Sequence, residues 1–353
     1  MSSAIQAEIR TVPRPSCALC GARGKPLYRE LADRRFHVPG RWGLNTCPDP
    51  ACGLIWLDPA PVEDDLVQAY RQYYTHATAN PTRGGLRRAR AAVAGGYLRR
   101  RLGYTRGIGP NWHGLLAPLA SLLPGGREEA AAEALFLDPP APGARLLEVG
   151  CGSGEQLARL RDLGWDVEGI DFDAEAVASA RSRGLPVRHG LIGEQDYPEG
   201  HFDVVVMVHV IEHVPDPIEL LRQCRELLKP GGRLVAITPN VGSWGHRRYG
   251  RDWLDLDPPR HLNLFSMKNF GGVLARAGFE DVRVQSLCRN ARSSLAVSHL
   301  YRAHLGATWE ELGRRPYRLR WKLRWSLYQY GERVLVAAGL AEGEEILGMA
   351  RRG

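Results

Sequence analysis

Short apolar runs and amphipathic stretches alternate through the second half of this chain. Amphipathic stretches with helical spacing, such as 155–160 and 217–228, separate runs that have the length and composition of buried strands. These runs lie at 146–149, 165–170, 185–189, 202–208 and 233–238. A helix that begins after Ser266 and ends near Gly278, followed by a strand at 281–286, continues the alternation. The pattern predicts an α/β fold with a doubly wound parallel sheet.

The first predicted strand runs directly into a glycine loop that contains Gly150, Gly152 and Gly154. Glycines let the backbone turn tightly and approach a ligand, and the helix that follows presents free N–H groups and the positive end of its dipole. An amino-acid carboxylate suits that place. The second strand ends at Asp171, whose carboxylate can bind the diol of a ribose. The sequence therefore predicts a ligand that carries both an amino-acid carboxylate and a nucleoside.

Four motifs occur in a fixed order: E-x-G-C-G-x-G at 148–154, the acid at 171, F-D-V-V at 202–205 and L-K-P-G-G at 228–232. Over about residues 140 to 290 the chain thereby resembles the class I S-adenosylmethionine-dependent methyltransferases. The resemblance implies the seven-stranded Rossmann-like sheet of that family, with 344–351 as a last strand antiparallel beside the strand at 233–238. It also implies that the glycine loop holds the methionine part of S-adenosylmethionine. The residues assigned to the donor are Glu148, Gly150, Cys151, Gly152, Gly154, Asp171, Phe172 and His209.

Four of the seven cysteines form two close pairs near the N-terminus, Cys17 with Cys20 and Cys47 with Cys52. A glycine follows the second cysteine of each pair, so each pair can fold back as a knuckle in which two thiolates converge. We expect a zinc ribbon over 10–58 in which the four thiolates hold one structural zinc ion. Unliganded thiols are the alternative. The other cysteines are expected to pack in the core: Cys151, Cys224 and Cys288.

Polar residues follow the strand at 202–208, where His209, Glu212 and His213 reach the carboxyl edge of the sheet, on which doubly wound folds bind ligands. The segment resembles the E-x-x-E-H motif of the ubiquinone-biosynthesis O-methyltransferases, which is linked to a divalent metal, with His209 in place of the first acid. Methyl transfer to an alcohol requires removal of a proton, so we expect His213 to act as the base, with Glu212 beside it. Two alternatives stay open: a divalent metal held by His209, Glu212 and His213, or a Glu-His pair that shapes the loop and caps the next helix.

A second candidate lies in the stretch 253–266, which matches W-x-x-L-D-x-P-R-H-L-x-x-F-S. It resembles small bacterial methyltransferases, many of them encoded for polysaccharide or secondary-metabolite assembly, and several of these also carry an N-terminal cysteine ribbon. In this stretch His261 is a candidate base, and Arg260 is a candidate ligand for a phosphate or carboxylate of the acceptor. The alternative is a loop fastened by an ion pair of Arg260 with Asp255 or Asp257.

Basic residues are concentrated in one segment. The net charge is +8, and from Leu66 to Arg127 there is no acidic residue but there are ten arginines, eight of them in Arg83–Arg106. The spacing in Arg83–Arg106 predicts a basic amphipathic helix interrupted by glycines, and a second basic segment, 314–324, predicts a helix with Pro316 at its start. A solvated helix face explains such arginines, as does a phosphate-bearing substrate or an anionic membrane surface, whereas nucleic acid is the weakest match.

Together these features predict a methyltransferase that acts on a hydroxyl of a sugar, a glycan or a related small biosynthetic intermediate, free or carrier-linked. A sugar C-methyltransferase stays open, as does an RNA methyltransferase that uses the ribbon and the basic segment. No amide-holding N-P-P-Y type motif follows the strand at 202–208, which counts against RNA. The intact glycine loop disfavours a non-catalytic scaffold.

The organisation expected along the chain has five parts. The parts are a zinc ribbon at 10–58, a basic helical connector at 59–138, the methyltransferase core at 139–289, a helical insertion or lid at 290–342 and the last core strand at 343–353.

The cysteines suit a reducing compartment, and the N-terminus has no apolar stretch. These two features predict a cytoplasmic protein, with a peripheral membrane contact as an option.

Overall fold

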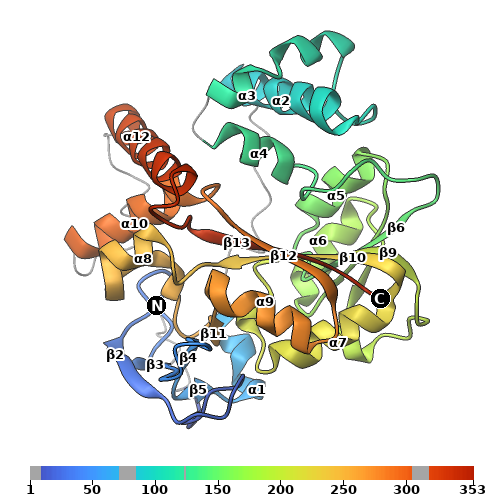
Figure 1. Ribbon diagram of the computed structural model, residues 1–353. Coiled ribbons are helices and arrows are strands. Elements are labelled where there is room, and N and C mark those ends of the chain that lie inside the picture. The colour runs from blue at the N-terminus through green and yellow to red at the C-terminus, as the bar shows by residue number, and fades with distance from the viewer. Residues whose placement is uncertain (1–8, 71–84, 123–124, 304–317) are drawn as a thin grey trace, which may run out of the picture.

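A mixed sheet of seven strands forms the centre of the computed structural model, which describes residues 9–70, 85–122, 125–303 and 318–353 (Figure 1). Its strands are β6 (Arg145–Val149), β7 (Asp166–Asp171), β8 (Val187–His189), β9 (Phe202–Val208), β10 (Leu228–Pro239), β12 (Glu280–Leu287) and β13 (Glu345–Arg351). The order is β12-β13-β10-β9-β6-β7-β8, with β6 to β10 parallel and β13 antiparallel to both of its neighbours. The predicted seven-stranded Rossmann-like sheet is confirmed, including its antiparallel last strand.

Helices cover both faces of the sheet. Neighbouring strand residues point to opposite faces, so apolar side chains on each face pack against helices. Leu146 packs with residues of α5 (Glu155–Asp162) and α6 (Ala174–Ser182), whereas Leu147 packs with residues of α7 (Pro217–Leu227) and α9 (Met267–Arg276). Three of these four helices, α6, α7 and α9, begin where a polar side chain caps them. The caps are Asp173 for α6, Asp216 for α7 and Ser266 for α9, the last as predicted.

The N-terminal part forms a second small sheet that is continuous with the core. Its strands are β2 (Lys25–Leu31), β3 (Trp42–Thr46) and β4 (Ile55–Leu57), and the edge of β4 pairs with β11 (Asn263–Leu264). A further pair joins β1 (Thr11–Val12) to β5 (Ala60–Pro61). Trp56 is fully buried in the same apolar cluster as Phe265 and Phe270, and the side-chain amide of Asn269 donates to the carbonyl of Cys52 at 2.8 Å. The cysteine-bearing part is thereby fixed to the loop that contains His261.

A helical lobe connects the two sheets, and Figure 1 shows α2 and α3 at its outer end, with α4 between them and the core. After α1 (Glu63–Leu66) and the 3-10 turn η1 (Val67–Tyr70), the elements are α2 (Gly85–Tyr97), the π-helical turn η3 (Leu98–Leu102), the 3-10 turn η4 (Asn111–Leu116), α3 (Leu119–Leu122) and α4 (Gly126–Ala132). The predicted basic helix is therefore present, but its predicted interruption by glycines is wrong, because α2 continues through Gly95 and Gly96 to Tyr97. Arg83 lies outside the described residues.

Further helices follow β10 and β12. They are α8 (Trp244–Tyr249), α10 (Ala291–Ala303) and α12 (Arg318–Ala337), and the short 3-10 turns are η5 (Ile192–Glu194), η6 (Ile211–His213), η7 (Gly250–Asp252) and η8 (Leu254–Leu256). Pro316, predicted to start a helix, falls outside the described residues, and α12 begins at Arg318. In the part of the chain that the structure describes, no helix combines the length and the apolar character needed to cross a membrane.

Candidate functional site

The glycine loop connects β6 to α5 in a backbone conformation that favours glycine. Gly150 has φ 69° and Gly154 has φ 77°. A Cβ atom at Gly150 would lie 2.5 Å from a methyl group of Val210, and one at Gly154 would lie 2.4 Å from a methyl group of Leu185. The loop is therefore packed against the segment that follows β9, which carries His209, Glu212 and His213.

Two buried carboxyl groups lie behind the loop. One oxygen of Asp171 accepts from the N–H of Gly152 at 2.7 Å, and the other accepts from the N–H of Asp173 at 2.9 Å. Burial raises the pKa of Asp171, and burial together with the charge of Asp171 raises the pKa of Glu148 to about 8. Oε2 of Glu148 has no hydrogen-bond partner among the described residues. A buried oxygen of this kind fits a site that a polar ligand completes.

His209 is held between two carboxylates rather than turned toward a ligand. Its Nδ1 lies 3.1 Å from Glu212 and its Nε2 lies 2.8 Å from Glu345, while Arg289 binds the same Glu345 at 3.0 Å. Burial acts to lower the pKa of His209, but the hydrogen bonds and charges of Glu212 and Glu345 outweigh it and raise that pKa well above its usual value. A histidine with both ring nitrogens engaged offers no lone pair to a metal, so the alternative of a divalent metal held by His209, Glu212 and His213 is wrong for His209.

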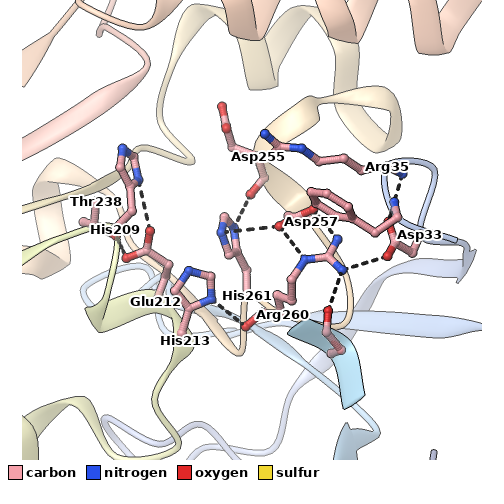
Figure 2. Close-up of polar contacts among 12 residues, drawn as sticks. Asp33, Arg35, His209, Glu212, His213, Thr238, Asp255, Asp257, Arg260 and His261 are labelled. Atoms are coloured by element: carbon pink, nitrogen blue, oxygen red, sulfur yellow. Dashed lines mark hydrogen bonds and ion pairs between the residues drawn. The ribbon is translucent and has the colours of Figure 1, made fainter. Parts of the chain in front are cut away.

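The structure brings His213 and His261 together beside Glu212, as Figure 2 shows. The two imidazole rings are 4.8 Å apart, and Glu212, His213 and His261 each place one ligand-type atom within 4.8 Å of the others. Nδ1 of His213 lies 3.0 Å from the carbonyl oxygen of Arg260, and Nδ1 of His261 lies 2.7 Å from that of Asp255. Because a carbonyl only accepts, each Nδ1 carries the proton and each Nε2 carries a lone pair.

Burial keeps the two imidazoles neutral. It lowers the pKa of His213 below the usual value, and burial together with the neighbouring His213 lowers the pKa of His261 to about 4. Burial acts to raise the pKa of Glu212, but His209 outweighs it and brings that pKa to about 2; the second oxygen of this carboxylate accepts from the hydroxyl of Thr238 at 2.9 Å. Near pH 7 the cluster therefore combines two neutral imidazoles with one carboxylate, which suits proton acceptance or cation binding.

Arg260 takes the second of the two roles expected for it. The guanidinium is fully buried, binds both oxygens of Asp257 at 2.6 and 2.9 Å and contacts Asp33 at 2.7 Å and the carbonyl of Ala69 at 3.3 Å (Figure 2). An arginine enclosed in this way does not face an acceptor, so its expected role as a phosphate or carboxylate ligand is corrected to fastening the loop. The helix-cap alternative for Glu212 and His213 is likewise corrected, because Asp216 caps α7.

Sequence reasoning missed Tyr70 and Glu345. The hydroxyl of Tyr70 lies 2.9 Å from Nδ1 of His213, and its ring meets the edge of Phe172, which directly follows Asp171 and is 42% exposed. Tyr70 comes from the connector, where no motif marks it, and Glu345 opens a strand that reads simply as apolar. The phenol of Tyr70 therefore links the predicted donor site to the histidine pair.

The four N-terminal cysteines converge as predicted. The sulfurs of Cys17 and Cys52 are 3.6 Å apart, those of Cys20 and Cys47 are 3.4 Å apart, and all four lie within 4.8 Å of one another. Zinc–sulfur bonds of about 2.3 Å in a tetrahedron require sulfur separations of about 3.8 Å. The knuckles close through N–H bonds of Gly21 to Cys17 and of Gly53 to Asp49, both at 2.9 Å. The donor set and spacing fit one zinc ion.

A parallel sheet with a glycine loop after its first strand and an acid after its second defines a Rossmann-like, nucleoside-binding enzyme. Residues 123–284 match a family model described as a methyltransferase domain. A probable S-adenosylmethionine-dependent methyltransferase of Mycolicibacterium smegmatis is 32% identical over 182 residues, which cover 48% of this chain and 68% of that relative. The chain belongs to the S-adenosylmethionine-dependent methyltransferases.

Other similar proteins are matched over a smaller share of their own length or have a lower sequence identity to this chain. A ubiquinone biosynthesis O-methyltransferase of Thiobacillus denitrificans is 37% identical over 29% of this chain and 47% of the relative, so the chain spans about half the length of that protein. A solved S-adenosylmethionine-dependent methyltransferase from Archaeoglobus fulgidus is 19% identical, covers 59% of this chain and 86% of its own, and has a TM-score of 0.41.

Proposed function

We propose that this methyltransferase transfers the methyl group of S-adenosylmethionine to a hydroxyl of a sugar, a glycan or a related small biosynthetic intermediate. The observation that carries the proposal is the pair of neutral imidazoles, His213 and His261, in the segments that border the glycine loop and the N-terminal sheet. A hydroxyl acceptor needs a base, and a relative that matches this chain is named as an O-methyltransferase. The sugar-like nature of the acceptor rests on the resemblance of 253–266 to bacterial polysaccharide enzymes.

The chain's own residues divide the work. The loop from Gly150 to Gly154 would let the donor approach the backbone, and the start of α5 would present its N-terminal end to the carboxylate of the donor. Glu148 would offer its unpaired oxygen, and Asp171 would bind the ribose diol. The bound donor supplies an electrophilic methyl group on a sulfonium. Nε2 of His213 accepts the proton of the hydroxyl as its oxygen attacks, and the carboxylate of Glu212 stabilises the imidazolium that forms.

His261 supports this step from the second loop. Its ring lies against that of His213, and its Nδ1 proton is fixed on the carbonyl of Asp255. His213 is half-buried, whereas His261 is 5% exposed, which favours His213 as the group that meets the acceptor. His261 then shapes and desolvates the surroundings of the base.

The zinc ion we propose for the four cysteines is structural. Four thiolates close a tetrahedral site and leave no position for a substrate. The knuckles pack in the cluster of Trp56 and Phe265, and β4 pairs with β11, which starts two residues after His261. Zinc binding would therefore hold the histidine-bearing loop in place through the small sheet.

A divalent cation at Glu212, His213 and His261 is the second candidate mechanism. Within the described part of the chain, these three residues are the one group besides the cysteines whose metal-ligand atoms lie close together. The cation would lower the pKa of the acceptor hydroxyl in place of a histidine base. Metal analysis and activity after chelation separate the two mechanisms, since a histidine base needs no added divalent ion.

The acceptor is identified with an isotope-labelled donor and a panel of nucleotide-linked sugars, read by mass spectrometry. We expect a labelled product whose methyl group NMR places on oxygen. A methyl group on carbon would replace the proposal with sugar C-methylation. Label found in RNA, with every sugar unmodified, would replace it with RNA methylation.

A further inference from the structure

Apolar side chains line the outer surface of the helical lobe. Trp112, Leu115, Leu119 and Leu122 are 59%, 74%, 42% and 73% exposed. They follow one another at intervals of three, four and three residues through η4 and α3, which places them on one face of consecutive helical turns. We call these four residues the apolar stripe. Large apolar side chains gathered on one exposed face indicate a contact surface.

The packing of α2 fixes the direction in which the stripe points. A Cβ atom at Gly96 would lie 2.0 Å from the carbonyl oxygen of His113, and one at Gly95 would lie 2.4 Å from that of Ile108. The two glycines therefore let the chain around η4 lie directly on the backbone of α2. The opposite side of η4 and α3 is closed by Ala117 and Ala120, which are 5% and 0% exposed. The stripe is thus turned away from the lobe's interior.

The stretch of sequence that contains the stripe carries arginines and no negative charge, since residues 67–126 contain no aspartate or glutamate. The guanidinium of Arg99 donates to the carbonyl of Gly109 at 2.9 Å, and that of Arg127 donates to the hydroxyl of Ser121 at 2.8 Å, so one arginine borders each end of the stripe. Further exposed arginines lie on α2 and η3: Arg88, Arg90, Arg100 and Arg101.

We propose that this lobe docks on an anionic lipid surface, with the apolar stripe inserted among the headgroups and the arginines paired with lipid phosphates. A tryptophan and leucines on one face, bordered by arginines, form the pattern of a helix that lies in a membrane interface. A nucleic acid would use the arginines but gives exposed leucines no partner, and a second copy of the lobe would bring like charges together. The inference concerns where the enzyme is held and goes beyond its choice of acceptor.

Sedimentation with lipid vesicles tests the docking surface on the full chain. One set of vesicles is phosphatidylcholine alone, and the other contains about 30% phosphatidylglycerol. We expect the protein to bind the anionic vesicles and to leave the neutral vesicles largely unbound. The double variant Trp112→Ala, Leu115→Ala should bind at least about tenfold more weakly, because two inserted apolar side chains are lost. Arg100→Gln with Arg101→Gln should lower binding by a similar factor, since each charge near an anionic surface contributes about fivefold.

Matched control variants lie elsewhere on the surface. Leu340→Ala removes a leucine that is 71% exposed, and Arg222→Gln removes an exposed arginine of α7, so both should bind vesicles as the unchanged protein does. Binding of S-adenosylmethionine by calorimetry verifies that every variant is folded. Three results would each overturn the proposal. They are equal binding to neutral and anionic vesicles, vesicle binding that is unchanged when the stripe is lost, and a dimer that dissociates only in the stripe variants. Retention on RNA in place of anionic vesicles would do the same.

Discussion

The hydroxyl oxygen of Tyr70 lies 2.9 Å from Nδ1 of His213, while the ring of Tyr70 meets Phe172 edge-on at 5.4 Å. The Nδ1 proton of His213 is thereby shared between this hydroxyl and the carbonyl of Arg260 at 3.0 Å. Burial raises the pKa of Tyr70, so the phenol stays protonated and neutral. One residue of the connector thus touches both the donor side and the proposed base.

Tyr70→Phe tests whether this contact positions the base. The variant keeps the ring against Phe172 and removes only the hydroxyl, so we expect turnover to fall up to about tenfold, in line with the loss of one neutral hydrogen bond. Donor affinity should stay within about twofold, and the acid limb of the pH–rate profile should shift. Tyr197→Phe, which removes a hydroxyl 3.2 Å from Glu168, is the matched control and should leave turnover unchanged. A parallel loss of donor affinity and turnover would instead mark Tyr70 as a packing residue.

Donor binding should depend on the carboxylate of Asp171. We expect Asp171→Ala to weaken S-adenosylmethionine binding at least tenfold, because a charge-assisted hydrogen bond to the ribose contributes about 1.5–3 kcal/mol. The control is Asp173→Ala, which removes the cap of α6 and should cost about 1 kcal/mol of stability while preserving donor affinity. Calorimetry on both folded variants decides the matter. Identical affinities for the two would argue against the assignment of Asp171.

The zinc proposal predicts one ion per chain, lost on Cys17→Ser or Cys47→Ser, because each knuckle supplies half of one tetrahedral site. Cys224→Ser, a buried cysteine of α7, should retain the ion. Plasma emission spectrometry of the purified proteins gives the content, and thermal unfolding should show a lower Tm for the two knuckle variants. A zinc-free protein that stays folded and active would refute the ribbon's metal role.

Local patterns in the sequence predicted the sheet, because each strand and each helix cap is encoded by neighbouring residues. Ser266 illustrates this, since its side chain accepts from the N–H of Asn269 and starts α9 where the pattern placed it. The cysteine pairs behaved likewise, because a knuckle is a short-range structure closed by its own glycine.

Side-chain partners from distant segments were not predictable in this way. Arg260 is bound by Asp33, a residue 227 positions away, and His209 is bound by Glu345, 136 positions away. Both partners lie in segments without a motif. Because these charges are buried in the folded protein, they pair with one another. The same pattern that marks an arginine as a phosphate ligand marks it equally as the centre of a buried ion pair, and only the fold separates the two.

Alanine variants of His213 and His261 should lower turnover without lowering the affinity for the donor. We expect His213→Ala to lower turnover by about 10²–10⁴-fold with donor affinity nearly intact, because general-base catalysis acts in the transition state. His261→Ala should lower turnover less than His213→Ala and also weaken acceptor binding, since His261 packs behind the base. Steady-state kinetics with the identified acceptor measure both. Near-unchanged turnover in both variants would leave catalysis to alignment alone.

The protonation of His261 should make stability depend on pH. Its pKa is about 4 in the folded protein, chiefly because of burial, and about 6.5 when the chain is unfolded. Between these values the unfolded chain binds the extra proton, so stability is fully present above about pH 6.5 and is lost as the pH falls toward 4. His261→Gln cannot take up this proton. Between about pH 7.5 and pH 4.5 its free energy of unfolding should therefore fall by about 2–3 kcal/mol less than that of the unchanged protein. Urea unfolding at both pH values measures the difference, and His37→Asn, at an exposed position, should follow the unchanged protein. Parallel stability curves for the unchanged protein and His261→Gln would show that this imidazole is protonated in the folded state.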